Sequence, residues 1–151
     1  MTTDWLTEAI ATREIERVKA NLGAAGERVN DARRHIRSAR LLAEDDTTLA
    51  MAACHDAIRK SAAAHMAANG LRARGGEGAH RIALDYLRHA LASKIAHEDL
   101  LEADEIRQDR ALAEYGDFAS RRLDAAHVLA AADVAERIVN AIANALASET
   151  S

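Results

Sequence analysis

The stretch that decides the fold is TLAMAACHDAIRKSAAAHMAANG, residues 48–70. Its larger apolar side chains recur at intervals close to the 3.6-residue repeat and fall on one stripe of an α-helix. The Asp-Thr pair at 46–47 supplies an N-cap for this helix, because either side chain can accept backbone N–H groups. The Asn-Gly pair at 69–70 ends it, because glycine tolerates the left-handed conformation found at helix ends. The pattern predicts a helix over about 48–68.

The composition extends this prediction to the whole chain. Of 151 residues, 37 are alanine, 14 are valine or isoleucine, and none is proline. Alanine is the best helix former and is depleted in strands, and proline is the main helix breaker. These counts exclude sandwiches, barrels and α/β sheets. We therefore expect an all-α antiparallel helical bundle in a chain long enough to bury a sizeable core.

The periodicity predicts five to six helices in total, with the longest at the C-terminus. The first begins near Thr3 or Asp4, carries Trp5, Ile10 and Val18 on its apolar side, and breaks at the glycines of 22–26. The glycine-rich stretch LRARGGEG at 71–78 is expected to be a mobile loop. We interpret residues 1–25 as an N-terminal helical extension and 26–148 as the bundle. The other helices are expected at about 27–43, 79–95, 98–114 and 119–147.

The last expected helix has the longest apolar stripe, with spacings of three or four residues throughout. This spacing predicts that one face of the helix is buried along its whole length. The stripe consists of Leu123, His127, Ala130, Val134, Ile138, Ile142 and Leu146.

Several classes of protein are disfavoured by simple features. The lone cysteine, Cys54, excludes an intrachain disulfide framework and a cysteine-rich zinc site. An acidic start without a long apolar run argues against a signal peptide, and no stretch of 18 apolar residues suits a membrane span. We expect a cytoplasmic protein without a membrane partner. Because an alanine core buries little apolar area, we also expect a homodimer.

The charge is distributed unevenly around a formal net value of −4, which argues against non-specific coating of nucleic acid. Residues 28–40 are rich in arginine, and residues 98–117 carry eight carboxylates against two arginines. Arg33, Arg37 and Arg40 share one face of the helix expected at 27–43. Two interpretations stay open: solvated faces that pair within the fold or across a dimer, or a basic face for phosphate beside an acidic partner surface.

Metal and cofactor chemistry has weak support in the sequence. Two carboxylate-x-x-histidine pairs occur, Glu77–His80 and Asp124–His127, but no glutamates stand on apolar stripes to face them. We therefore expect neither a metal nor a cofactor. Three histidines on expected helices have apolar neighbours and are interpreted as core or interface residues. They are His55, His65 and His127.

The segment EIRQDRALAEYGDF, residues 105–118, is the strongest candidate for a functional site. Arg107, Arg110 and Glu114 follow helical spacings of three and four, and Tyr115 comes just before a break. The guanidinium forks can bind phosphate, and a phenol can donate a hydrogen bond or act as an acid. The alternative interpretation is an intrahelical arginine–glutamate network, with the tyrosine packed on the last helix.

Three stretches within residues 27–147 resemble the HEPN family, the higher eukaryotes and prokaryotes nucleotide-binding domain. They are DARRHIRSARLLAEDDTTLAMAACHDAIRKSAAAHMAANGLRARG, then IRQDRALAEYGDF, then the alanine-rich last helix. The resemblance implies a dimeric all-α bundle that handles RNA or nucleotides, in several cases as a toxin paired with a nucleotidyltransferase or in phage defence. It implies a metal-independent RNase where an arginine is followed, four to six residues later, by a histidine.

This chain differs from the family signature at its central position. It has Arg110 followed by Tyr115 where the family has histidine, and Ala111 where asparagine often follows the arginine. A phenol of pKa near 10 is a poor general base at neutral pH, whereas imidazole is well matched. The resemblance therefore favours an RNA- or nucleotide-binding module, in which Arg107 binds phosphate together with the arginines at 33, 37 and 40.

Two alternatives stay open. One is a metal-independent endoribonuclease toxin with Arg110 and Tyr115 as catalytic residues. The other is a helical scaffold that binds a partner protein through its alanine-rich faces and has no catalytic role.

Overall fold

The chain is an all-α bundle with a long C-terminal helix, as the sequence predicts. This computed structural model describes residues 2–76, 78–115 and 123–149, and their side chains except those of 2–3 and 113–115. No helix within these ranges is long and apolar enough to span a membrane. The described residues form helices α1 (Thr2–Ala11), α2 (Leu22–Leu42), α3 (Thr47–Ala68), α4 (Ala79–Ala90), α5 (His97–Tyr115) and α6 (Ala125–Glu149), and strands β1 (Ile15–Arg17) and β2 (Leu71–Ala73).

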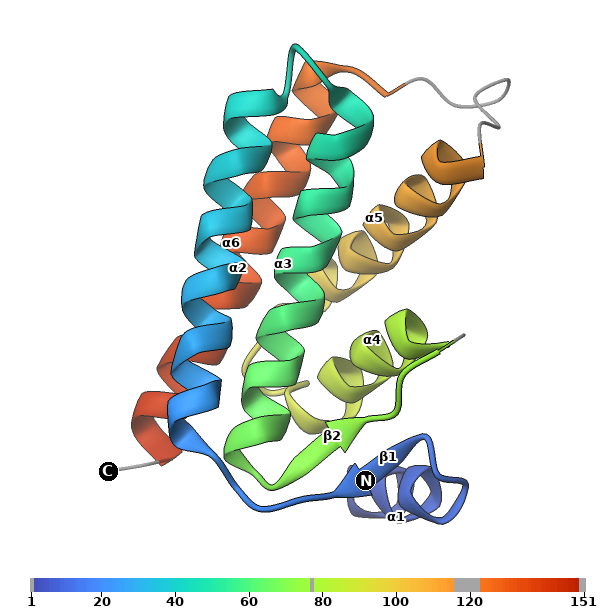
Figure 1. The fold of residues 1–151 in the computed structure, drawn as a ribbon, viewed down its shortest axis with the longest axis vertical. Coiled ribbons are helices and arrows are strands. Elements are labelled where there is room, and N and C mark those ends of the chain that lie inside the picture. Colours follow the sequence, from blue (N-terminus) through green and yellow to red (C-terminus); the bar gives the residue numbers. More distant parts are fainter. Residues whose placement is uncertain (1, 77, 116–122, 150–151) are drawn as a thin grey trace.

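Helix α3 lies at the centre of the molecule. It packs against α2, α4, α5, α6 and β2, with α2 antiparallel beside it and α6 behind the pair (Figure 1). Twelve of its 22 residues are buried, and five of these are alanines. Alanine methyl groups let helix axes approach closely, so the thin side chains of α3 allow neighbours on several sides.

The caps of α3 are where the sequence places them. The Asp46 carboxylate accepts a hydrogen bond from the Leu49 backbone N–H at 3.0 Å. At the other end Asn69 is the C-cap, and Gly70 follows in the left-handed region with φ 71°. Both ends of the central helix are therefore fixed by local chemistry.

The predicted break at 22–26 is wrong, because α2 begins at Leu22 and continues through both glycines. The helix starts there because the Asn21 side chain accepts a hydrogen bond from the Ala24 N–H at 2.9 Å. The Asn21 backbone N–H in turn donates to the Ala67 carbonyl at 2.9 Å, which attaches the start of α2 to the end of α3. Burial of Ala25 against the core offsets the weak helix propensity of the glycines.

The first helix is shorter than its apolar pattern predicts and ends at Ala11. Arg13 has φ 63°, a left-handed conformation that stops the helix and turns the chain. Ile15–Arg17 then pairs antiparallel with Leu71–Ala73, so the start of the loop expected at 71–78 is a strand. Ile15 is completely buried in a small second core, which also contains Ala9, Met66, Leu71, Ile82 and Tyr86.

The apolar stripe predicted for the last helix is correct only in its second half. Val134 is buried as expected, and so are Ile138 and Ile142. His127 and Ala130 are exposed instead of buried, because the first turns of α6 direct Val128 and Ala131 into the core. Residues 119–122, where this helix was expected to begin, lie outside the described residues.

We predict that Gly70→Ala destabilises the protein, whereas Gly26→Ala stabilises it. A Cβ at residue 70 would lie 2.9 Å from the Val18 carbonyl oxygen and would also be strained by its positive φ. The expected loss in the free energy of unfolding is about 1–3 kcal/mol. At the exposed helical Gly26 a Cβ meets no atom within 4 Å, so a gain of about 0.5–1 kcal/mol is expected. Urea denaturation measures both, and an equal effect at the two sites would contradict this account.

Candidate functional site

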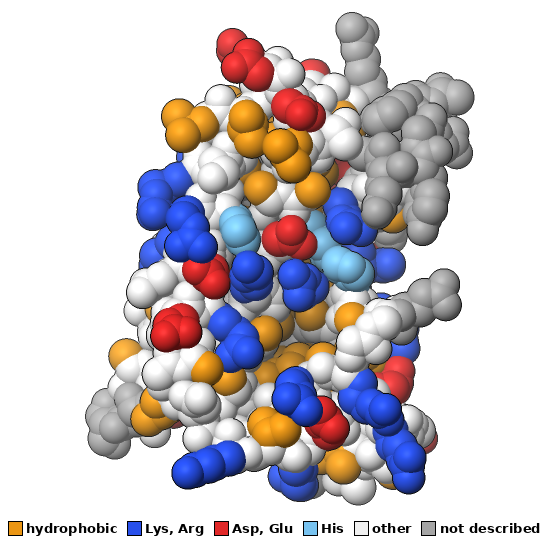
Figure 2. All heavy atoms as spheres, in the orientation of Figure 1, with side chains coloured by type: hydrophobic (Ala, Val, Ile, Leu, Met, Phe, Trp, Pro, Cys, Tyr) orange, Lys and Arg blue, Asp and Glu red, His pale blue; other side chains and the backbone are white. Residues whose placement is uncertain are grey.

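A hollow of about 540 Å³ opens between α2, α3, α4 and β2. Among the described residues that line it there are five cationic side chains and no carboxylate. Figure 2 shows this face, where arginines and lysines surround a patch of apolar side chains. We call it the cationic hollow and define it by Lys19, Arg28, Arg59, Arg72 and Arg74.

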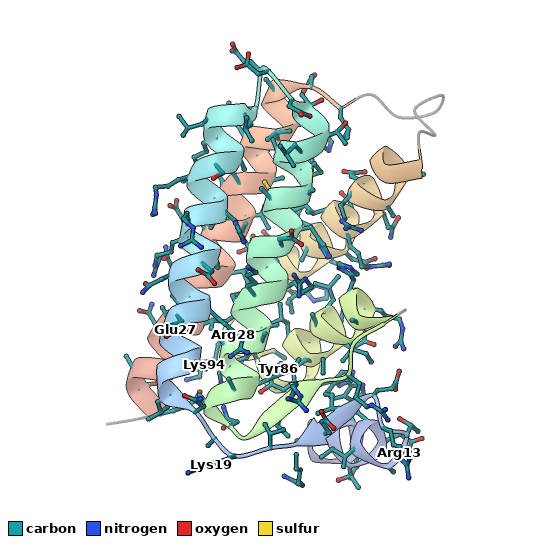
Figure 3. All side chains as sticks on the ribbon, in the orientation of Figure 1. Arg13, Lys19, Glu27, Arg28, Tyr86 and Lys94 are labelled. Carbon is teal, nitrogen blue, oxygen red and sulfur yellow. The ribbon has the colours of Figure 1, made fainter. Side chains whose placement is uncertain are left out.

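Backbone contacts fix the walls of the cationic hollow. Lys19 lies in the connection from β1 to α2, and Arg28 follows on α2 (Figure 3). This connection is held because the Val18 N–H donates to the Gly70 carbonyl at 2.9 Å. On the opposite wall, the Arg74 N–H donates to the Glu14 carbonyl at 3.0 Å. The cations therefore come from a rigid frame, although four separate segments supply them.

Much of the positive charge in the hollow is not neutralised within the described part of the chain. Arg72 forms an ion pair with Glu16, and Arg59 lies 3.6 Å from Asp56. The side chains of Lys19, Arg28 and Arg74 form neither an ion pair nor a hydrogen bond with any described residue. A concave surface with surplus cations attracts anions.

The floor of the hollow is apolar and made of small residues. Met66, Ala67 and Ala83 are buried there, and Ala63 is half-buried. Protein interiors normally fill such space with side chains, so a floor of methyl groups leaves room for another molecule.

Two histidines lie beside the hollow. The Nε2 atom of His55 on α3 lies 2.6 Å from the Nδ1 atom of His80 on α4, and the two ring centroids are 4.7 Å apart. His55 is almost completely buried, with 1% of its surface exposed. Its Nδ1 atom is buried as well and has no hydrogen-bond partner among the described residues.

Burial, together with the positive charges of His80, Arg110, Arg59 and Arg107, lowers the pKa of His55 to about 3. His55 is therefore neutral at physiological pH. Arg107 and Arg110 therefore lie within electrostatic range of His55. We call His55, His80, Arg59, Arg107 and Arg110 the arginine–histidine cluster. Arg59 belongs to both this cluster and the cationic hollow, which makes the two sites neighbours.

The structure thus brings two predicted site residues, Arg107 and Arg110, within electrostatic range of His55, which the sequence indicates as a core or interface residue. Arg107 also forms an ion pair with Asp104 one turn earlier, at 3.1 Å. Tyr115 is the last residue of α5, and its side chain, like that of Glu114, lies outside the described residues. The predicted meeting of Arg110 and Tyr115 stays a prediction.

The three arginines predicted to share a face of α2 lie along its contact with α6. Arg33 donates a hydrogen bond to the Asn140 side chain at 2.8 Å. Arg40 binds the carboxylates of Glu136 and Asp133, and these hydrogen bonds raise the pKa of its guanidinium. Arg37 is exposed. Of the two interpretations of this face, the pairing of charges within the fold holds at Arg40. A role of the face in phosphate binding stays a prediction.

The other two helical histidines have different surroundings. His65 is buried as expected, with Nδ1 2.7 Å from the Tyr86 hydroxyl and Nε2 3.0 Å from a Glu149 carboxylate oxygen. His127 is exposed, and its Nε2 lies 3.1 Å from the buried carboxylate of Asp109. Neither belongs to a metal site, since no three His, Cys, Asp or Glu side chains gather around a common point within 2–76, 78–115 and 123–149.

Sequence reasoning missed the cationic hollow. The clearest local signal was the pair of arginines in LRARGG, residues 71–76, which had been interpreted as part of a mobile loop. The other cations are far apart in sequence and carry no shared motif. Comparisons of the chain with protein-family models, curated proteins and solved structures give no match.

We predict that His55 makes the protein sensitive to acid. The unfolded chain binds a proton at His55 below about pH 6.5, whereas the folded chain does so only near pH 3. The free energy of unfolding should therefore fall as pH drops through this window. The slope of this free energy against pH should correspond to the uptake of up to about one proton on unfolding. His55→Gln should flatten the slope because its amide does not titrate.

Urea denaturation between pH 4 and 7 measures this slope. The control is His97→Gln at the exposed start of α5, which should leave the slope as it is in the unmodified protein. An unchanged slope in His55→Gln would contradict the burial argument.

Proposed function

We propose that this protein is an RNA- or nucleotide-binding module that holds phosphate groups in the cationic hollow. The observation that carries the proposal is the set of five cations around an apolar floor, without a carboxylate among the described lining residues. Guanidinium groups bind phosphate through paired N–H donors, and Arg28 and Arg74 have no competing carboxylate among the described residues. Arg59 extends the same positive potential to Arg107 and Arg110.

The proposal includes the setting that the HEPN resemblance implies. In that setting residues 26–148 form a HEPN-like bundle, which acts as a homodimer in a cytoplasmic toxin–antitoxin or phage-defence system. A nucleotidyltransferase would be the protein partner. The all-α bundle with its long last helix is the architecture that the resemblance requires. Dimer, partner, location and pathway stay predictions.

We predict that the protein binds single-stranded RNA with an affinity that falls steeply as salt rises, because phosphate contacts release counterions. Arg28→Ala should weaken binding and reduce the slope of log affinity against log salt by about 0.7–1. Fluorescence anisotropy with a labelled oligoribonucleotide measures both quantities.

The matched control is Arg34→Ala, which removes the same charge from the same helix. Arg34 lies outside the hollow and pairs with Asp31 at 2.6 Å, so the salt slope should stay unchanged. A lack of affinity for RNA and nucleotides even at low salt would overturn the proposal and favour the scaffold alternative, in which the helical faces bind a protein.

A second candidate function is metal-independent cleavage of RNA, and the arginine–histidine cluster favours it. An imidazole of the pair would accept the ribose 2′-hydroxyl proton while the 2′-oxygen bonds to phosphorus. The bond from phosphorus to the 5′-oxygen then breaks, and a proton passes to that oxygen. Arg110 would stabilise the charge on the phosphate. In this version a histidine of the pair supplies the general base, and Tyr115, which the sequence predicts as a catalytic residue, is not needed for the reaction.

We predict that, if the cluster is catalytic, the protein cleaves RNA in the presence of EDTA. Arg110→Ala and His80→Ala should each reduce the rate by at least about 100-fold, which is the usual contribution of a charge-stabilising donor and of a general base, respectively. Tyr115→Phe should leave the rate unchanged. Gel analysis of labelled RNA measures the rates, and circular dichroism checks folding. Full loss of cleavage in Tyr115→Phe would show that the tyrosine is catalytic. Full cleavage activity in both Arg110→Ala and His80→Ala would show that the arginine–histidine cluster is not catalytic.

A further inference from the structure

We propose that the cationic hollow is a pocket for one nucleoside monophosphate unit, with its heterocycle on the apolar floor and its phosphate on the arginines of the rim. This inference rests on the proposed function and narrows it. The unit could be a free mononucleotide or the phosphorylated end of an RNA strand, because both present the same base, sugar and phosphate monoester.

The size of the hollow is the first argument. Its volume of about 540 Å³ falls within the range of about 300–1,000 Å³ that is typical of small-molecule sites. A surface that follows an RNA backbone needs a line of cations and has no need for a hollow of this volume. The volume therefore suits a compact ligand.

The chemistry of the walls is the second argument. The rim is cationic, whereas the floor contains Ala63, Met66, Ala67 and Ala83. Inorganic phosphate would use only the rim, and an uncharged ring would use only the floor. The methionine thioether packs well against a flat aromatic ring. A nucleoside monophosphate uses both surfaces in one molecule.

The hydrogen-bonding state of the rim is the third argument. The Nε of Arg59 is buried and makes no hydrogen bond with a described residue, and the Asp56 carboxylate oxygen lies 3.6 Å from it. A buried donor without an acceptor costs free energy, so an acceptor from a ligand would stabilise this arrangement. Arg28 is half-buried on the neighbouring helix α2, and its side chain has no partner among the described residues. A phosphate placed between these two arginines would satisfy both.

The rigid frame of the hollow is the fourth argument. The connection that carries Lys19 is held by hydrogen bonds from Val18 and Asn21 to the end of α3, both 2.9 Å long. On the other side, β2 is held by its antiparallel pairing with β1. A site whose walls are already fixed loses little conformational entropy when a ligand binds.

The test fills the floor without changing any charge. Ala63→Leu places a larger side chain in the hollow, and Ala52→Leu is its control because Ala52 lies on the same helix outside the hollow. Isothermal titration with AMP, adenosine and inorganic phosphate measures affinity. We expect AMP to bind at least tenfold more tightly than either fragment. Ala63→Leu should weaken AMP binding at least tenfold, whereas Ala52→Leu should leave it unchanged.

A second variant covers the case in which Ala63→Leu fails to fold. Arg74 is exposed, so Arg74→Glu should fold normally, and it should abolish AMP binding by placing a carboxylate at the rim. RNA binding without any AMP binding would overturn the pocket and leave the proposed function intact. Absence of both RNA and AMP binding would overturn the proposed function itself.

Two oligoribonucleotides distinguish the sources of the ligand. If only the 5′-phosphorylated strand displaces AMP, the pocket holds an RNA end. If neither the 5′-phosphorylated nor the 5′-hydroxyl strand displaces AMP, the pocket holds a free mononucleotide. Equal displacement by the two strands would show that a terminal phosphate is not recognised and would contradict the proposal.

Discussion

The close packing of helices around the small side chains of α3 is the constraint on which the rest of the structure depends. Five alanines are among the buried residues of this helix, and helices α2, α4, α5 and α6 all contact it. Methyl groups allow these approaches, but they bury little apolar area for each residue. The core therefore relies on the number of neighbouring helices more than on the size of any side chain. Since α3 contacts several neighbours, its buried histidines His55 and His65 lie at junctions with α4.

These polar residues attach α4, which forms one wall of the hollow. His55 of α3 bonds to His80 near the start of α4, and His65 bonds to Tyr86 further along α4. Figure 3 labels Tyr86. Burial raises the pKa of Tyr86, so its hydroxyl keeps its proton and can donate to His65. Buried polar pairs of this kind specify one arrangement of helices when their hydrogen bonds are made. Two histidines on one helix thus set the position of the short helix that borders the hollow.

How much the sequence predicts depends on how local the determining interaction is. The limits of α3 were predictable because Asp46 and Gly70 act within one turn of the helix ends. Strand β1 was not, because Ile15–Arg17 is too short to show a strand pattern and its partner lies 56 residues away. Arg107 and Arg110 were found as a pair from helical spacing alone. Their neighbours His55 and His80, and the cations of the hollow, meet only through tertiary packing.

The cationic hollow exists in a protein of net charge −4 because no carboxylate lines it among the described residues. Asp99 binds Arg137, Asp104 binds Arg88 and Arg107, and Glu136 binds Arg40. These pairs neutralise arginines along α2, α4, α5 and α6, and the surplus positive charge is left at the hollow. The potential that an approaching anion meets is set by the nearest charges, since salt screens distant ones within about 10 Å. A net negative charge disfavours general coating by RNA, so anions are attracted only where cations are in local surplus, as they are at the hollow.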